Sequence, residues 1–114
     1  VDGKGWLGIS RGFLEHHGVV AGDLLVVAVV GNGMEPRLSD GDQVVVNCAD
    51  QGLRDGQTFV FRFGEEMVVK QVQMLPQSHV QLVGSNPEFP PILVNLKDTD
   101  MAVVGRVLAA VHVM

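Results

Sequence analysis

Two features of the sequence have the residue types and spacing that chemistry would require. The first is a glycine-rich corner, Gly31-Asn32-Gly33-Met34-Glu35-Pro36, which follows the apolar run Leu24–Val30. The second is a single lysine, Lys70, inside the apolar run Met67–Val72. A lysine amine that burial keeps neutral can act as a general base, whereas a strand lysine more often lays its stem on apolar surface and its ammonium in water. The residues alone leave both readings of Lys70 open.

The corner is compatible with a tight hairpin, because Asn32-Gly33 tolerates positive φ at both positions. Pro36 argues against a hairpin, since a returning strand would lose a backbone donor almost at once. We therefore predict a sharp corner that exposes residue 33. The two glycines are not a dinucleotide-binding signal, because no helix is predicted after them.

The remaining candidate groups predict no further site. His16 and His17 are adjacent and would face different sides of a helix, while His79 and His112 are solitary, so no metal site is expected. No serine lies in a Gly-x-Ser-x-Gly context. The single Cys48 cannot form an internal disulfide, which fits a reducing, cytoplasmic setting. No cofactor is predicted.

Composition bounds the fold and the partners. The 114 residues indicate one domain, and 46% apolar residues with 14 Gly and 5 Pro suit short strands joined by tight turns. A net charge of −5 argues against this domain gripping DNA or an anionic membrane by itself. No apolar run reaches the roughly 18 residues of a membrane span. The chain begins at Val1 rather than Met, so we expect a fragment or processed product, with something further upstream.

The chain divides into an N-terminal arm with a short helix, residues 1–18, and a mostly antiparallel β domain, residues 19–114. Ser10 is expected to cap the helix, which would end near His17. Leu24–Val30 is apolar on both faces and predicts a central, doubly buried strand. Asn86–Pro91 predicts a rigid loop that cannot join a central sheet. The expected strands are Leu24–Val30, Gln43–Asn47, Thr58–Phe63, Glu66–Leu75, His79–Val83 and Met101–Val113, the last bent at Gly105.

Four blocks in this order resemble the C-terminal domain of the LexA and phage-repressor family, the S24-type Ser–Lys self-cleaving fold. They are Gly31–Pro36 with Asp40-Gly41-Asp42 and the strand after it, Val69-Lys70-Gln71-Val72, Asn86-Pro87-Glu88-Phe89-Pro90-Pro91, and Val104-Gly105-Arg106-Val107. The resemblance covers roughly residues 19–114. It implies the small antiparallel β domain of that family, which is signal-peptidase-like.

One position departs from the family pattern. The resemblance places the family's serine nucleophile at Gly33 and its general base at Lys70. Because glycine has no hydroxyl, Lys70 would be a remnant base with nothing to deprotonate, and we expect no enzymatic activity. Ala21-Gly22 lies too near the corner to match the family's scissile bond. Gly33 is either natural, which we favour, or an engineered replacement of serine.

The resemblance implies the oligomerisation domain of a phage-type, lambda-repressor-like transcriptional repressor that acts in lysogeny, in the cytoplasm of a bacterial host. A helix-turn-helix domain upstream of this chain would contact operator DNA, and an antirepressor or a RecA filament is a candidate regulatory partner. The expected homo-oligomer interface is the exposed edge of the closing strand: Val103, Val104, Val107, Val111 and Val113. Two alternatives remain, a Ser–Lys self-cleaving protease inactivated at Gly33, and a UmuD-like polymerase partner.

Overall fold

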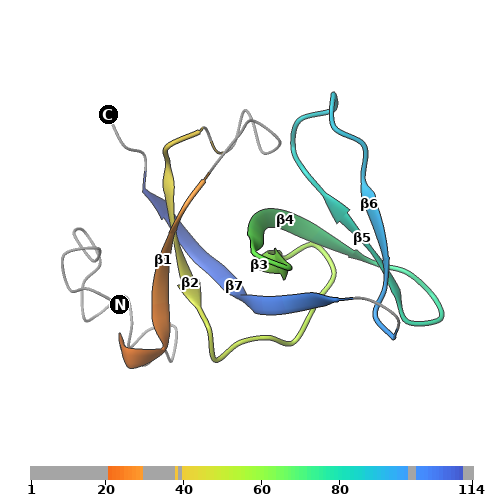
Figure 1. The fold of residues 1–114 in the computed structure, drawn as a ribbon, viewed down its shortest axis with the longest axis horizontal. Coiled ribbons are helices and arrows are strands. Elements are labelled where there is room, and N and C mark those ends of the chain that lie inside the picture. The colour runs from red at the N-terminus through yellow and green to blue at the C-terminus, as the bar shows by residue number, and fades with distance from the viewer. Residues whose placement is uncertain (1–20, 30–37, 39, 98–99, 112–114) are drawn as a thin grey trace.

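The structure is a computed structural model, and it describes residues 21–29, 38, 40–97 and 100–111. Seven strands form one antiparallel sheet in the order β1-β2-β7-β3-β4-β5-β6 (Figure 1). The strands are β1 (Leu24–Ala28), β2 (Gln43–Asn47), β3 (Thr58–Phe63), β4 (Glu66–Met74), β5 (His79–Val83), β6 (Ile92–Asn95) and β7 (Met101–Val111). The predicted small antiparallel β domain is therefore confirmed. The predicted arm and helix in residues 1–18 lie outside the described residues.

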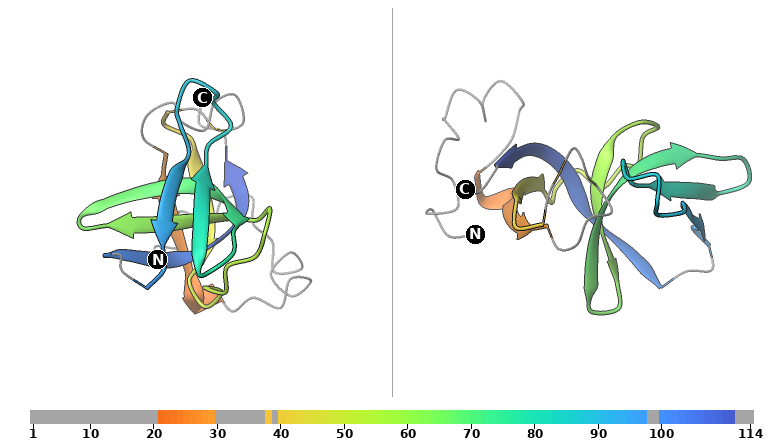
Figure 2. Two further views of the ribbon diagram at one scale, coloured as in Figure 1. Left: turned by 90° about the vertical axis from the view of Figure 1, so that its right-hand side faces the viewer. Right: turned by 90° about the horizontal axis from the view of Figure 1, so that it is seen from above.

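One strand, β7, is shared by the two halves of the sheet. Its N-terminal half, Met101–Arg106, pairs with β3, and its C-terminal half, Arg106–Val111, pairs with β2. Among the residues of β7, only Arg106 has a strand partner on both sides, Asn47 in β2 and Phe59 in β3. The sheet is strongly curled, with β1 and β2 at one end, β5 and β6 at the other, and β7 running diagonally between them (Figures 1 and 2).

The curled sheet encloses two apolar clusters, and β3 contributes to both. Its side chains alternate, so that Val60 enters the first cluster while Phe59 and Phe61 enter the second. The two phenylalanine rings lie 6.2 Å apart in a tilted arrangement. The first cluster is Val29, Leu38, Val44, Val46, Val60 and Val69. The second is Phe59, Phe61, Val72, Val80, Leu82 and Val94.

The prediction of a central, doubly buried first strand is wrong. β1 terminates the sheet and pairs only with β2. Leu24 is buried, but the next three side chains are half-buried and Ala28 is exposed. The sequence misleads here because an unbroken apolar run is equally compatible with an edge strand whose side chains the core covers only partially. The strands that are buried on both faces are β2 and β3, each with three consecutive side chains that are fully buried.

The closing strand has a free edge along only part of its length. Residues 107–111 pair with β2 alone, so within the described chain the opposite edge of this half has no strand partner. Residues 101–105 instead pair with β3. Two register shifts leave Val104 and Leu108 as extra residues opposite β3 and β2 respectively. Val113 lies outside the described residues.

A strand that the sequence reading missed follows the proline-rich loop. β6 pairs with β5 and ends the sheet on that side. Pro90 and Pro91 directly precede it, and prolines are tolerated at the start of an edge strand. The loop itself is outside the sheet, as predicted, but the four residues after it are not.

Gly105 lies where β7 passes from one half of the sheet to the other. A Cβ at this position would overlap the carbonyl oxygen of Asn47 and would lie 2.8 Å from the carbonyl carbon of Asn47 and 2.9 Å from the Cα of Cys48. These are backbone atoms, which cannot turn aside as a flexible side chain could. The glycine is therefore required for close approach of two backbones.

We predict that Gly105→Ala lowers the free energy of unfolding by about 2 kcal/mol, because the methyl group must push two strands apart. Urea denaturation monitored by circular dichroism measures the change. Gly52→Ala is the matched control, since a Cβ there meets nothing within 4 Å and the backbone needs no left-handed conformation. Equal stabilities of the two variants would contradict the close-approach argument.

Candidate functional site

The base of the glycine-rich corner is a continuation of the β1–β2 hairpin. The Val29 amide donates to the carbonyl of Asp42 at 2.7 Å, and the Gly41 amide donates to the carbonyl of Val29 at 2.9 Å. Gly41 has φ of +93°, a left-handed conformation that favours glycine over other residues. The Asp40-Gly41-Asp42 block is thus explained by a turn that holds the start of β2 against the end of β1.

A buried leucine anchors this loop to the body of the domain. Leu38 is 8% exposed and belongs to the first apolar cluster together with Val29, so both described residues that flank Gly31–Pro36 pack into the same cluster. Val69, the residue before Lys70, belongs to it as well. Gly33 lies outside the described residues, so its placement opposite Lys70 stays a prediction.

Lys70 is a half-buried amine on β4. It pairs with Phe59 of β3, and by strand alternation it shares a face with Val68 and Val72, as the sequence predicted. Val72 is part of the second cluster and Val68 packs against it. Burial lowers the pKa of the Lys70 amine below its ordinary value, and Lys70 has no hydrogen-bond or ion-pair partner among the described residues. The amine is therefore partly desolvated, and no described residue compensates for this.

The described residues do not bring Lys70 and the flanks of the corner onto one face. Val29 and Leu38 belong to the first cluster, whereas the neighbours that share Lys70's face contact the second. Val69 links the first cluster to Lys70, since it belongs to that cluster and precedes Lys70 in the sequence. The structure thus places the described flanks of the corner, Val29 and Leu38, in the same apolar cluster as Val69 of β4.

Two hollows are lined by described residues of the sheet. One of about 340 Å³ borders the unpaired edge of β7 and has no titratable side chain in its lining: Leu38, Gly56, Gln57, Thr58, Val107, Leu108, Ala109 and Ala110. The other, of about 280 Å³, is lined by Asp55, Gly56, Gln71, Val72, Gln73 and Val83. Lys70 lines neither hollow, so neither is a ready-made catalytic cleft for it.

Cys48 is a poor substitute nucleophile. Burial, and secondarily the Asp23 carboxylate, raise the pKa of its thiol. The reactive form of cysteine is the thiolate, so a raised pKa makes the side chain less reactive at neutral pH. Cys48 instead packs against the first cluster as a small apolar residue.

An ion cluster that the sequence reading missed joins the loop after β2 to β7. The Asp50 carboxylate accepts hydrogen bonds from Arg106 Nε at 2.9 Å and from Arg54 at 2.6 Å, and the Arg106 amide donates to the Asp50 carbonyl at 3.0 Å. Burial raises the pKa of Asp50, but the two arginine hydrogen bonds outweigh it and hold that pKa below its ordinary value. The pairing spans 56 residues of sequence, and no local pattern could have shown it.

Among the residues that the structure describes, no three His, Cys, Asp or Glu side chains gather as a metal site would require. The same residues contain no helix with the length and apolar character needed to cross a membrane.

Comparison with known proteins decides the family. Residues 8–108 match the model of the Peptidase S24-like family. The chain belongs to the Peptidase S24-like family. It is also similar to proteins named LexA repressor: 44% identical over 66 residues to that of Pseudomonas chlororaphis, 41% to that of Pseudomonas aeruginosa (strain LESB58) and 38% to that of Dechloromonas aromatica.

The match to these repressors is partial on both sides. It covers 58% of this S24-like chain and 31–32% of each relative, so the chain aligns with about a third of the relatives' length. The coarse prediction, a domain of the LexA/S24 family related to repressors, is confirmed. The finer predictions, phage origin and loss of cleavage, are taken up below.

We predict that Lys70→Met raises the free energy of unfolding at neutral pH by about 1 kcal/mol, because the variant keeps the apolar stem and removes a desolvated charge. The pKa of Lys70 is lower in the folded protein than in the unfolded chain. Between these two pKa values unfolding takes up a proton, so the stability of the wild type rises with pH across that window. The advantage of Met should therefore shrink as pH rises towards the unfolded lysine pKa of about 10.4.

Urea denaturation at a series of pH values measures this difference. Lys97→Met is the control, since Lys97 is exposed in the turn after β6. A Lys70→Met variant that is less stable than wild type at neutral pH would show that the amine has a stabilising partner.

Proposed function

We propose that this S24-like chain is the oligomerisation domain of a phage-type transcriptional repressor that does not cleave itself. The observation that carries the proposal is Gly33, which occupies the family's serine position inside an otherwise matching block. The relatives named LexA repressor support the regulatory part of the proposal. Operator DNA would be contacted by a helix-turn-helix domain outside this chain, which agrees with the net charge of −5.

The chemistry explains why one residue has this consequence. A Ser–Lys mechanism needs a hydroxyl for the neutral lysine to deprotonate, and the resulting alkoxide attacks the peptide bond. Glycine offers no nucleophilic atom. The half-buried Lys70 would still have its lowered pKa, but proton abstraction would have no substrate. Release from DNA would then depend on another partner, such as an antirepressor, rather than on cleavage triggered by a RecA filament.

The C-terminal half of β7 is the proposed homodimer contact. Its edge at residues 107–111 has no strand partner in the described chain, and the hollow beside it has a mostly apolar lining. Val103 packs against the second cluster, and Val104 and Val107 pack against the first, so the core already uses part of their surface. Val111 packs against neither cluster and is the side chain most available to a second copy.

Pairing two such domains has a defined effect on operator binding. Tethering two DNA-binding heads converts the second binding event into an intramolecular one, which raises its effective concentration. A two-fold dimer also matches the symmetry of a palindromic operator. Further contacts between dimers would give cooperative occupancy of neighbouring operators.

We predict that the chain sediments as a dimer at tens of micromolar and that Val111→Asp shifts it towards monomer, because a buried unpaired charge opposes association. Sedimentation equilibrium measures the shift. Met67→Asp, on the exposed tip of the β3–β4 hairpin, is the control and should leave the dimer intact. A wild-type chain that stays monomeric at these concentrations contradicts the proposed function.

The second candidate function is a Ser–Lys self-cleaving protease whose nucleophile has been replaced. The lowered pKa of Lys70, caused by burial alone, favours it, since a neutral amine is what the family's base requires. The two candidates differ in whether the rest of the site can still react.

We predict that Gly33→Ser does not cleave an added peptide with an Ala-Gly bond at any pH, because a natural repressor without its nucleophile has no reason to keep the geometry. Mass spectrometry after incubation across neutral and alkaline pH detects the products. Cleavage that increases with pH through the lowered pKa of Lys70, and that disappears in Gly33→Ser with Lys70→Ala, would instead support the inactivated protease.

A further inference from the structure

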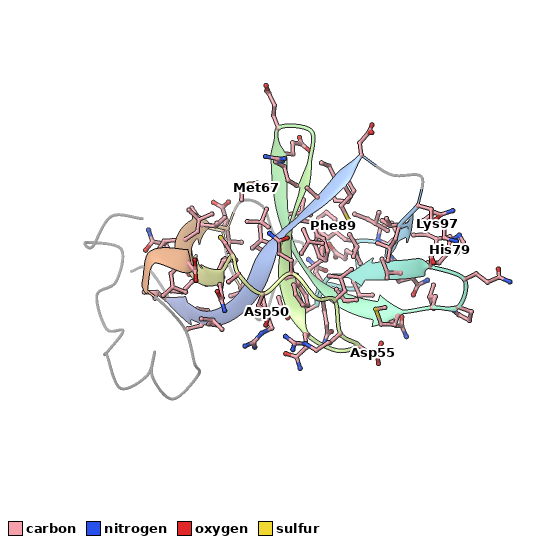
Figure 3. All side chains as sticks on the ribbon, turned by 90° about the horizontal axis from the view of Figure 1, so that it is seen from below. Asp50, Asp55, Met67, His79, Phe89 and Lys97 are labelled. Atoms are coloured by element: carbon pink, nitrogen blue, oxygen red, sulfur yellow. The ribbon has the colours of Figure 1, made fainter. Side chains whose placement is uncertain are left out.

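β7 and β3 lie side by side along part of the sheet and separate at one end. They are paired as far as Arg106 and Phe59, and the next residues in the same register would be Val107 and Thr58. From Arg106 onwards β7 instead pairs with β2. Val107 and Thr58 both line the hollow of about 340 Å³, so this hollow opens where the two strands diverge. We call it the β3–β7 fork, and β3 begins beside it, just after the loop that holds Asp55 (Figure 3).

The register of β2 shows which backbone groups of β7 face the fork. The carbonyl of Asp42 accepts a hydrogen bond from β1, so the residues of the same parity, Val44 and Val46, also direct their backbone groups towards β1. Their partners in β7, Ala110 and Val107, therefore occupy non-hydrogen-bonded positions beside β2. The N–H and C=O of Val107 and Ala110 point to the opposite edge, where no described strand pairs with them.

The first residue of β3 supplies the other wall of the fork. The Gly56 amide donates to the Val72 carbonyl, and the Val72 amide donates to the Gln57 carbonyl. Val72 is thus the hydrogen-bonded residue of β4, and Thr58 pairs with the next one, Gln71, in a non-hydrogen-bonded position. The N–H and C=O of Thr58 therefore point away from β4 and towards the diverging β7.

We propose that the β3–β7 fork is a peptide-binding site, which takes one extended, uncharged segment of a partner protein as an inserted strand. One edge of the segment would pair with Val107 and Ala110, and its other edge would pair with Thr58. Val107 and Ala110 are about 10 Å apart along the strand, so about three residues of the segment enter the fork. Since the homodimer contact uses the same edge of β7, the segment would compete with a second copy, and this competition rests on the proposed oligomerisation function.

An isolated strand fits the fork better than a second copy of the chain does. A single segment has two free edges and can pair with both walls. The C-terminal half of β7 in a second copy is bound along one edge by its own β2, so it has only one edge to offer. A second copy would therefore pair with the β7 wall and leave Thr58 without a partner. Two facing walls also distinguish the fork from an ordinary sheet edge, which has one.

The lining of the fork determines the chemistry of the segment. The described lining contains no titratable side chain, and it is mostly apolar, with Gln57 and Thr58 as its polar side chains. A charge brought into this lining would lose water and find no opposite charge, so charged segments are excluded. Small or branched apolar side chains suit the surface formed by Leu38 and residues 107–110. A protein with such a segment would displace the second copy and weaken operator binding, which is how an antirepressor would act.

Binding of a synthetic peptide tests whether both walls are used. The probe is the fluorescently labelled peptide Thr-Val-Ala-Val-Thr with a blocked C-terminus, and fluorescence anisotropy measures its affinity at protein concentrations below those that give a dimer. Two further peptides are N-methylated at the odd or at the even positions, so each lacks the amide donors of one edge. Both should bind about tenfold more weakly, because each loses hydrogen bonds to one wall. Full affinity of either N-methylated peptide would show addition to a single edge and overturn the insertion, and no binding of the unmodified peptide would overturn the fork itself.

A pair of variants at one position tests the wall formed by β3. Thr58→Pro removes the N–H that faces the fork, and proline is tolerated there because Thr58 begins β3 and its N–H is not used in pairing with β4. Thr58→Val lacks the same hydroxyl but keeps the N–H. Thr58→Pro should bind the peptide about tenfold more weakly than Thr58→Val. Equal affinities of two folded variants would overturn the backbone pairing, and the N-methylated peptides decide the question if Thr58→Pro does not fold.

Sedimentation equilibrium tests the competition with the second copy. Saturating unmodified peptide should convert the wild-type dimer to monomer, while the N-methylated peptides at the same concentration should leave most of the dimer intact. Peptide bound to an undissociated dimer would overturn the pairing with β7. A chain that is monomeric without peptide would contradict the proposed function, whereas binding of the peptide to that monomer would still support the fork.

Discussion

The whole fold depends on one crossing point, where β7 leaves β3 and joins β2. Arg106 is the one residue of β7 that has strand partners on both sides, and the first apolar cluster contains residues from both of the halves that β7 connects. Gly105 lets the backbones of β7 and β2 approach there, and Arg106 binds the Asp50 carboxylate in the loop that follows β2. Without this close approach, the β1–β2 hairpin would lose its connection to the other strands. The Gly-Arg pair in the closing strand therefore has a structural explanation that is independent of catalysis.

Local patterns predicted most strands but not how they are arranged. Alternation and turn residues located β2, β3, β4 and β5 with nearly the observed bounds, because these signals depend on neighbouring residues. The order of the strands depends on contacts between distant segments, and this is why β1 was expected at the centre and is found at the edge. β6 was missed because four residues between a double proline and a turn have too little pattern to detect. The Asp50–Arg106 pair was missed because, like the strand order, it depends on contact between segments that are distant in the sequence.

The candidate site was predicted from resemblance more than from physics. The residues alone left Lys70 undecided between a surface lysine and a buried base, and the structure finds an intermediate case, half-buried with a lowered pKa. The Asp40-Gly41-Asp42 block has a local explanation, because Gly41 adopts the left-handed backbone of a turn. What no spacing rule could give is the relation of residue 33 to Lys70, since it depends on how the loop closed at Val29 and Asp42 is oriented.

A partly desolvated amine that has no partner among the described residues costs stability, so the presence of Lys70 at this position needs a physical reason. The long stem of Lys70 offers one, because its methylene groups cover apolar surface beside Val68 and Val72 whether or not the amine reacts. This packing would favour a lysine at position 70 whether or not position 33 supplies a nucleophile.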